Sequence, residues 1–288
     1  MNHAHHPSEA VQPTSLTGSQ HLRKRDYQRW AMLRGRRRLQ FLRAAVVGLL
    51  AGVIAVSFQW SLFLMEEQRN RLLHWLHTLP GYVALLLLPL IALVAGAGGW
   101  LTQRFAPEAA GSGIPHIKAV LRHLRSLHWQ RLLPVKYVGS LLGIGAGLSL
   151  GREGPTVQMG AAVGQAVGDL LHVPRKSRDH LIACGGGAGL AAAFNAPLAG
   201  FIFVIEEFQR DLSPLTYGTA LIAAVTADIV TRTFTGQLPS FHIQGYALPP
   251  LTALPLFAVV GLAAGLVGLL FNKRSEERRV GKECRSRW

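Results

Sequence analysis

Long stretches without charge alternate along this chain with short stretches that are charged or rich in glycine. A helix that crosses a membrane needs roughly 20 consecutive apolar residues. Several windows of that length in one chain favour a polytopic membrane protein over a soluble protein with a very large core. The windows that contain no Asp, Glu, Lys or Arg are residues 44–65, 72–103, 180–205 and 233–272.

The segments between and within these windows are interrupted by glycine and proline. Residues 111–126 are too short and too charged to span a bilayer, and residues 152–172 are bounded by charge at both ends. Non-helical backbone at membrane depth is tolerated only inside protein or beside a water-filled cavity, and transporters use broken helices to direct helix ends at an ion. We therefore predict an all-α polytopic membrane protein with short broken and re-entrant helices. Its helical segments are expected at 44–65, 81–103, 111–126, 134–151, 152–172, 180–193, 196–208, 214–234 and 251–272.

Glycines recur at every fourth position in two neighbouring segments. Residues four apart lie on the same face of a helix, and a glycine face lets a second helix approach closely. We therefore predict two helix faces that serve helix packing. Their positions are Gly139, Gly143, Gly147 and Gly151 in the first segment, and Gly160, Gly164 and Gly168 in the second.

Positive charge gathers at two places in the sequence. The formal net charge is +15, but residues 44–272 hold fourteen basic and ten acidic residues, whereas residues 21–43 hold nine basic residues and one acid. A basic flank directly before an apolar window is cytoplasmic under the positive-inside rule. It carries no aromatic platform or known reader motif, which argues against a nucleic-acid partner. We expect a disordered polar tail over 1–22, a basic cytoplasmic lead-in over 23–43, a transmembrane domain over 44–272 and a non-native tail over 273–288.

Composition and cysteine usage narrow the class of protein. Charged residues make up only 16% of the chain, against about 25% in an average soluble domain. The two cysteines are Cys184, in an apolar stretch, and Cys284, in a basic one. They imply neither a disulfide framework nor a metal site. We expect no metal and no cofactor.

The sequence Gly-Arg-Glu-Gly-Pro at 151–155 places a carboxylate where a helix begins. Pro155 suits a first helical turn, and Gly154 lets the backbone come close to a bound group. The first amides of a helix are unpaired and carry partial positive charge, which makes an anion site. Glu153 is therefore predicted to act as a tethered anion that competes for this site. A helix-terminal salt bridge with Arg152 is the alternative.

Gly-Ser-Gly-Ile-Pro at 111–115 repeats this pattern. A small, flexible turn again opens a short helix with proline in its first turn, and Ser112 adds a hydroxyl donor. A serine at this place could also be a simple N-cap. Two such turns in one membrane protein favour a shared anion site.

Two acids, Glu206 and Glu207, end the apolar run 198–205. Paired acids at a helix C-terminus are locally unfavourable, so one of them could take up protons from the aqueous side. An ordinary water-facing boundary is the alternative. The glycines at 185–189 do not indicate a phosphate-binding loop, because no strand precedes them and no lysine follows.

These motifs resemble those of the CLC family of chloride channels and proton–chloride antiporters. The resemblance rests on residues 111–115, residues 151–155 and the sequence Gly-Leu-Ala-Ala-Ala-Phe-Asn-Ala-Pro-Leu-Ala-Gly at 189–200, in the family's order and spacing. It covers about residues 41–272. The proline in the second motif is similar to that of the chloride-type members rather than the fluoride-selective branch.

The resemblance implies a role for each matched residue. Ser112, next to Gly113, looks like the hydroxyl that coordinates the central chloride. Glu153 looks like the gating glutamate, which competes with chloride and carries a proton when it swings out, and the amides at Gly154 and beyond would face the same pathway. Arg152 belongs to the same motif. Glu207 matches the internal proton glutamate of the antiporters, at the inner end of a proton path that Glu206 adjoins.

The implied function is chloride transport, and the acid at position 207 favours a proton-coupled antiporter because many plain channels of the family lack it. Two alternatives stay open: a passive, voltage-gated-type chloride channel of the same family, and a non-transporting truncated fragment. The family fold has two inverted-topology halves. Residues 44–272 match the first half and the opening helix of the second, without the second half's Gly-x-Phe-x-Pro loop or its late chloride-coordinating tyrosine. We therefore expect only part of the anion site in this chain.

The resemblance also implies partners and a location. Chloride and protons would be the transported ions, and the full-length protein would be a homodimer in a lipid bilayer. The location would be the cell membrane, as a multi-pass protein with a cytoplasmic N-terminus, and the inner membrane in a Gram-negative bacterium. A transporter of this kind is not an enzyme.

Overall fold

The computed structural model describes residues 16–76, 87–208, 214–236 and 249–285. Every regular element in these ranges is a helix or a helical turn. The chain divides into two compact units, Met1–Ser240 and Phe241–Trp288, which are described separately. The first unit contains all the residues predicted to form the site.

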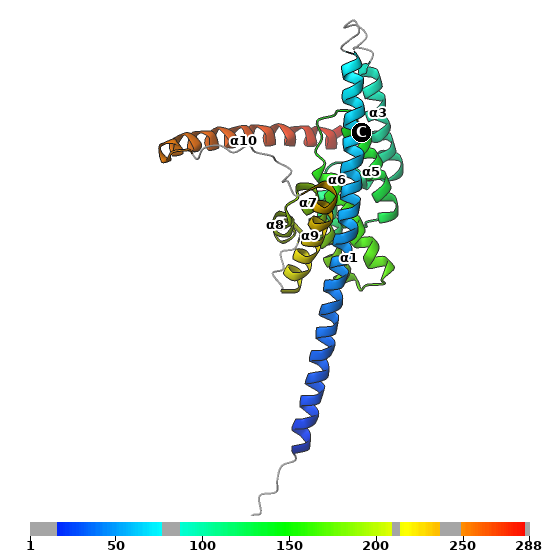
Figure 1. Ribbon diagram of the computed structural model, residues 1–288, viewed down its shortest axis with the longest axis vertical. Coiled ribbons are helices and arrows are strands. Elements are labelled where there is room, and N and C mark those ends of the chain that lie inside the picture. The colour runs from blue at the N-terminus through cyan, green and yellow to red at the C-terminus, as the bar shows by residue number, and fades with distance from the viewer. Residues whose placement is uncertain (1–15, 77–86, 209–213, 237–248, 286–288) are drawn as a thin grey trace, which may run out of the picture. The chain divides into compact units, whose positions relative to one another are not determined.

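Helix α1 is a single helix over Leu16–Leu76 (Figure 1). It contains the predicted basic lead-in and the first span, and it continues beyond residue 65, where we expected the span to end. Residues 16–22, which we assigned to a disordered tail, are helical, while residues 1–15 lie outside the described residues. The helix continues past residue 65 because α1 contains no proline. Two ion pairs between neighbouring turns also stabilise its charged last part, Arg69–Glu66 at 3.3 Å and Arg71–Glu67.

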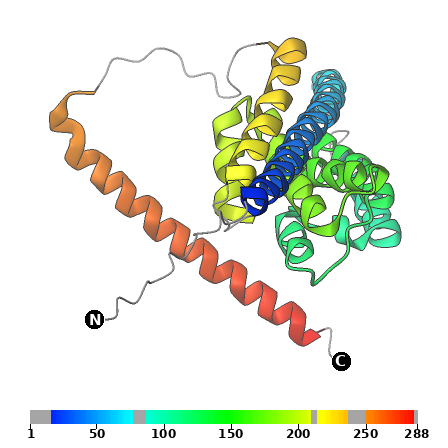
Figure 2. The ribbon, with the colours of Figure 1, turned by 90° about the horizontal axis from the view of Figure 1, so that it is seen from below.

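Small residues bring α1 against α9, Pro214–Thr235, and α7, Arg175–Phe194. The two views in Figures 1 and 2 both show α9 running beside α1. A Cβ at Gly48 would overlap the carbonyl oxygen of Ala223, so the two backbones touch there. The core between these helices is built from small side chains, chiefly Ala44, Ala51, Ala55, Ala183, Ala188, Ala192, Ala220, Ala223 and Ala227.

The second glycine face brings α6, Glu153–Leu170, against α7. A Cβ at Gly160 would overlap the carbonyl oxygen of Gly185, and one at Gly164 would overlap that of Leu181. The predicted packing face over Gly160 and Gly164 is therefore confirmed. Backbones this close gain from dispersion along their whole contact, which drives helix association where lipid replaces water.

The prediction of the first glycine face, at positions 139–151, is only partly correct. Helix α5 covers Trp129–Gly145, so Gly147 and Gly151 follow the helix rather than lining it. Gly147 has a φ of +93°, and the Leu148 N–H donates to the Gly143 carbonyl at 3.3 Å. This is the Schellman arrangement that ends helices at a glycine, and it frees residues 148–152 to form the turn before α6.

Shorter helices complete the first unit. Asn195 separates α7 from α8 as predicted, because it adopts the left-handed conformation with a φ of 56°. The chain then turns into α8 at Pro197, which suits a first helical turn. The remaining elements are α3, Leu87–Phe105; the 3-10 turn η1, Pro107–Ala109; α4, Ile114–Leu121; α8, Pro197–Phe203; and the π-helical turn η2, Val204–Phe208.

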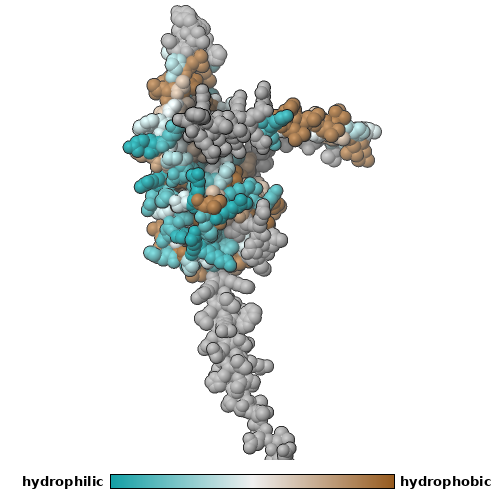
Figure 3. All heavy atoms as spheres, turned by 180° about the vertical axis from the view of Figure 1, so that it is seen from behind, coloured by the Kyte–Doolittle hydropathy of each residue, from teal (hydrophilic) through white to brown (hydrophobic). Residues whose placement is uncertain are grey.

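The second unit consists of the 3-10 turn η3, Leu251–Ala253, and the long helix α10, Leu254–Arg285. The side chains of residues 254–271 on α10 are apolar and exposed, as the brown helix in Figure 3 shows. No element boundary falls at residue 272, where we expected a foreign tail to begin. Among the described residues, Arg38–Leu76 and Leu251–Lys273 are long and apolar enough to cross a membrane, by length and composition.

The contact between α6 and α7 predicts a strong response to one added methyl group. Gly164→Ala should destabilise the fold by about 1–3 kcal/mol, because the Leu181 backbone cannot yield as a flexible side chain would. The matched control is Gly99→Ala on α3, where a Cβ would meet nothing within 4 Å. Thermal unfolding of the purified variants, followed by tryptophan fluorescence, measures both. An equal melting temperature for the two variants would contradict the assigned role of Gly164.

Candidate anion site

The turn before α4 is built by glycines that hold backbone conformations disfavoured for other residues. Gly111 has a φ of 72° and Gly113 a φ of 83°, and Gly113 is the N-cap of α4. Ser112 lies exposed between them, while Gly113 is buried. The first backbone bond of α4 runs from the Ile117 N–H to the Gly113 carbonyl at 3.0 Å. Ser112 thus lies directly before the N-cap of a short helix, at its positive end.

Helix α6 begins in the same way. Arg152 is its N-cap and Glu153 its first residue, both half-buried. Thr156 closes the first turn, with its hydroxyl donating to the Glu153 carbonyl at 2.8 Å. Among the described residues, no side chain caps the N-terminus of either α4 or α6.

The two turns, which lie about forty positions apart in the sequence, meet in the structure. A Cβ at Gly154 would lie 2.7 Å from the Ser112 carbonyl oxygen and 3.2 Å from the Ser112 Cβ. Only a residue without a side chain allows this approach. The structure therefore brings Ser112 and Gly113 together with the first residues of α6, as the shared-site hypothesis requires.

Glu153 folds back over the turn that precedes it. A Cβ at Gly151 would overlap the carboxylate oxygen Oε2 of Glu153. Glu153 also lines a hollow of about 460 Å³, together with Arg152 and residues of α1 that include Glu66 and Arg69. The carboxylate thus lies at the edge of a space that an ion could enter.

Two residues that the sequence analysis missed hold the Ser112 turn in place. Lys136 on α5 is buried, and its ammonium donates to the Ala109 carbonyl at 2.8 Å and to the Gly111 carbonyl at 2.6 Å. A signal was present, because Lys136 is the one charged residue in the apolar segment 134–151. A charge in such a segment is a functional candidate by default.

Gln158 on α6 is the second of these residues. It is fully buried, and its amide donates to the Glu108 carbonyl at 2.9 Å. Its carbonyl oxygen has no partner among the described residues, and a Cβ at Gly113 would lie 2.5 Å from that oxygen. An uncharged polar residue inside a helix has no distinctive sequence signal, which explains the omission.

The two predicted proton-path acids have different surroundings. Glu206 is exposed, whereas Glu207 is half-buried and forms an ion pair with Lys118 of α4. One short helix therefore carries the Ser112 turn at its start and the partner of Glu207 five residues beyond its N-cap. The structure thus connects Glu207 to the Ser112 turn through α4.

The third motif, residues 189–200, supports the first turn of α6 from behind. A Cβ at Gly189 would overlap the Thr156 carbonyl oxygen. Gln59 of α1 donates to the Ala192 carbonyl at 3.0 Å, which ties the same stretch to the long helix. All three motifs therefore meet around the start of α6.

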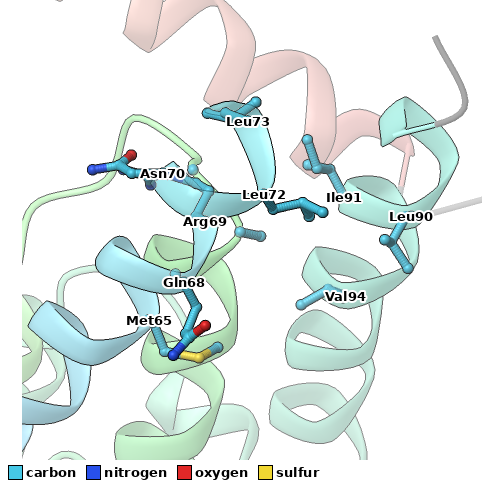
Figure 4. A pocket seen from close by; sticks show the side chains of 12 residues that line it. Met65, Gln68, Arg69, Asn70, Leu72, Leu73, Leu90, Ile91 and Val94 are labelled. Carbon is cyan, nitrogen blue, oxygen red and sulfur yellow. The ribbon is translucent and has the colours of Figure 1, made fainter. Parts of the chain in front are cut away.

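A second hollow of about 600 Å³ lies between the last turns of α1 and the first turns of α3 (Figure 4). Its lining is mostly apolar, with Leu72, Leu90, Ile91 and Val94 facing one another in the close-up. It contains none of the predicted site residues, so it is not part of the candidate anion site.

Comparison with known proteins gives consistent matches. The family described as "Voltage gated chloride channel" matches residues 90–279. The protein named H(+)/Cl(-) exchange transporter ClcA from Vibrio vulnificus is 44% identical over 238 residues, covering 80% of this chain and 50% of the relative. Its namesake from Cronobacter sakazakii is 40% identical over 235 residues, covering 81% of this chain and 50% of the relative.

Solved structures agree with this assignment. A slow cyanobacterial Cl⁻/H⁺ antiporter has a TM-score of 0.76 at 38% identity, over 81% of this chain and 56% of the other. A CLC-type fluoride/proton antiporter has a TM-score of 0.63 at 27% identity, over 80% and 55%. The predicted all-α CLC-type fold is confirmed.

The chain spans about half the length of the curated relatives it matches. Within that span, both the family match and the relatives cover far more than the three motifs. The chain therefore belongs to the voltage-gated chloride channel family, to which the name CLC refers.

Proposed function

We propose that this chain serves proton-coupled chloride transport across a membrane. The observation that carries the proposal is the meeting of two uncapped helix N-termini at Ser112 and Gly154, with the carboxylate of Glu153 beside them. The names of the relatives, H(+)/Cl(-) exchange transporters and a Cl⁻/H⁺ antiporter, support the same reading.

The proposed gate works by competition between two anions for one site. The amides at the start of α6 and the hydroxyl of Ser112 stabilise negative charge. When deprotonated, Glu153 can occupy this site through its own carboxylate and exclude chloride. A proton on Glu153 removes its charge, weakens its hold on the amides and lets chloride enter. Gly113 and Gly154 keep the backbone close enough for these contacts.

The buried ammonium of Lys136 has a supporting role in this proposal. It holds the carbonyls of Ala109 and Gly111 and places a positive charge behind the Ser112 turn. In surroundings of low dielectric, such a charge acts over a longer distance than in water. Chloride at Ser112 would therefore be stabilised by a charge that it does not contact.

Protons reach Glu153 from Glu207 in this scheme. Glu207 is half-buried and its neighbour Glu206 is exposed, so the pair forms a boundary between water and the protein interior. We propose Glu207 as the inner proton acceptor and Glu206 as its contact with the aqueous side. No cofactor is needed, because both transported species bind directly to side chains and backbone amides.

We propose a multi-pass cell-membrane protein with residues 44–272 as its transmembrane domain, and the inner membrane as its location in a Gram-negative bacterium. The basic stretch 23–43, directly before the apolar part of α1, supports a cytoplasmic N-terminus. The exposed apolar side chains of α10 are suited to lipid or to a further helix. The family resemblance supports a homodimer for the full-length protein.

The gate assignment predicts the behaviour of Glu153→Gln, which imitates a permanently protonated carboxyl. In proteoliposomes with an outward chloride gradient and the membrane potential clamped, the full-length wild-type protein should take up protons as chloride leaves. Glu153→Gln should still release chloride, at rates that are equal at acidic and neutral pH, while proton uptake falls to the protein-free level. Chloride and pH electrodes in the same vessel measure both fluxes.

The matched control is Glu67→Gln, which removes a carboxylate on α1 that pairs with Arg71. It should leave the ratio of protons to chloride unchanged. Persistent proton uptake by Glu153→Gln would refute the gate assignment.

The proton-path assignment predicts that Glu207→Gln uncouples the two ions. Chloride release should continue, but the proton uptake that accompanies it should stop, because a neutral amide cannot accept and pass on the proton. A passive channel predicts a different result. Glu207 would then be dispensable, and neither the wild type nor any variant would drive protons against their gradient. The same electrodes distinguish the two, and proton uptake by Glu207→Gln at the wild-type ratio would exclude this residue from the path.

A further inference from the structure

Helix α4 contacts both proposed ion sites. Its N-cap, Gly113, adjoins Ser112, and Lys118 on its second turn pairs with Glu207. At a rise of about 1.5 Å per residue, the five residue steps from Gly113 to Lys118 span roughly 7.5 Å. A displacement of this helix therefore acts on both ends at once.

The two ends of α4 are bounded by residues in left-handed conformations. Gly111 and Gly113 precede the helix, and His123 follows it with a φ of 60°. A backbone held by such residues forms a compact segment with a turn on either side. The helix is therefore a separate short segment that is joined to the chain by a turn at each end.

What holds α4 against the rest of the protein is a small apolar contact and few polar ones. Ile117 and Val120 are buried in a cluster with Val157 of α6 and Ile182 of α7. At the end of the helix, the His123 Nε2 lies 3.6 Å from an Asp179 carboxylate oxygen. Toward η2, the described polar contact is the ion pair from the Lys118 Nζ to the Glu207 Oε1.

Among the described residues, charged and titratable groups on the elements packed closely around Glu207 lie on η2, α4 and α7. Helix α8 carries none, and η2 itself adds only Glu206. Helices α4 and α7 also pack against η2. Their groups are His116, Lys118, Arg122 and His123 on and after α4, and Arg175, Lys176, Arg178, Asp179, His180 and the thiol of Cys184 on α7.

We infer that Lys118 is a positioning residue that transmits the protonation state of Glu207 to the Ser112 turn. A deprotonated Glu207 holds Lys118 and fixes α4 against η2. A proton on Glu207 removes the negative charge, so the ammonium is released toward water and α4 loses its ion pair with η2. The Ser112 turn then moves with the helix that it begins.

This inference extends the proposed function, because it states how a proton at one site reaches the anion at the other. The ion pair and its release do not themselves require transport. Hydrogen exchange of the α4 amides reports the release directly, whether or not ions cross the membrane.

The test compares hydrogen exchange in the full chain, in lipid nanodiscs, at a series of pH values, corrected for intrinsic exchange. The reporting peptide covers residues 114–124, and residues 129–145 of α5 serve as the internal reference. Lys118→Met removes the charge and keeps the stem, Lys118→Arg keeps the charge, and Glu207→Gln imitates the protonated partner. The matched control is Arg122→Met, a change at the exposed C-cap residue of α4.

In the wild type, exchange of the α4 peptide should accelerate as the pH falls. At neutral pH, Lys118→Met and Glu207→Gln should both exchange about two- to fivefold faster than the wild type, which is the range expected for a partly exposed ion pair. Neither should accelerate further on acidification. Lys118→Arg should follow the wild type, and Arg122→Met should not differ from it.

Equal protection of α4 in the wild type and in both charge-removing variants would overturn the inference. So would an acceleration in Arg122→Met as large as that in Lys118→Met. If Lys118→Met also loses protection in α5, global unfolding is indicated, and Glu207→Gln with an intact α5 then decides. Failure of the wild type to couple protons to chloride in the electrode assay would refute the proposed function and leave this result standing.

Discussion

Backbone contact between α6 and α7 sets where Glu153 lies. Glycine at positions 160 and 164 lets α6 lie directly on the carbonyls of α7. The position of α6 in turn decides where its first turn meets Ser112. A larger residue at either glycine would move the helix start, and with it the carboxylate, away from the second turn. The site therefore depends on residues that never contact an ion.

Polar groups inside this protein stabilise irregular backbone more than they stabilise one another. Lys136 satisfies two carbonyls that no helix uses, and Gln158 satisfies a third. Unpaired carbonyls away from water are costly, so these two side chains allow a tight turn where a regular helix would otherwise be required. The same turn presents the Ser112 hydroxyl. The contacts of Lys136 and Gln158 that support this turn therefore also form the candidate site.

The sequence predicts helix breaks and helix faces well where a local rule applies. Asn195 and Pro197 end one helix and begin the next, and the glycines at 160 and 164 mark a packing face, because both effects depend on residues close in the chain. The family motifs also located both turns. Gly147 was misassigned because glycine spacing alone does not distinguish a helix face from a helix end. The length of α1 was missed because we expected the charged residues after position 65 to end the helix. They indicate only that this part of the helix lies in water. Lys118 could not be predicted as the partner of Glu207, since the two residues meet only through tertiary packing.

The π-helical turn η2 has a consequence for how the two acids are oriented. A π turn accommodates one more residue than an α turn, and each residue advances a helix by about 100°. The extra residue changes the direction in which every later side chain points, which is compatible with an exposed Glu206 beside a half-buried Glu207. Insertion or deletion of a single residue between Phe203 and Glu206 would rotate Glu207 away from α4 while both acids stay in the sequence. The spacing of these positions is therefore as much a part of the site as their chemistry.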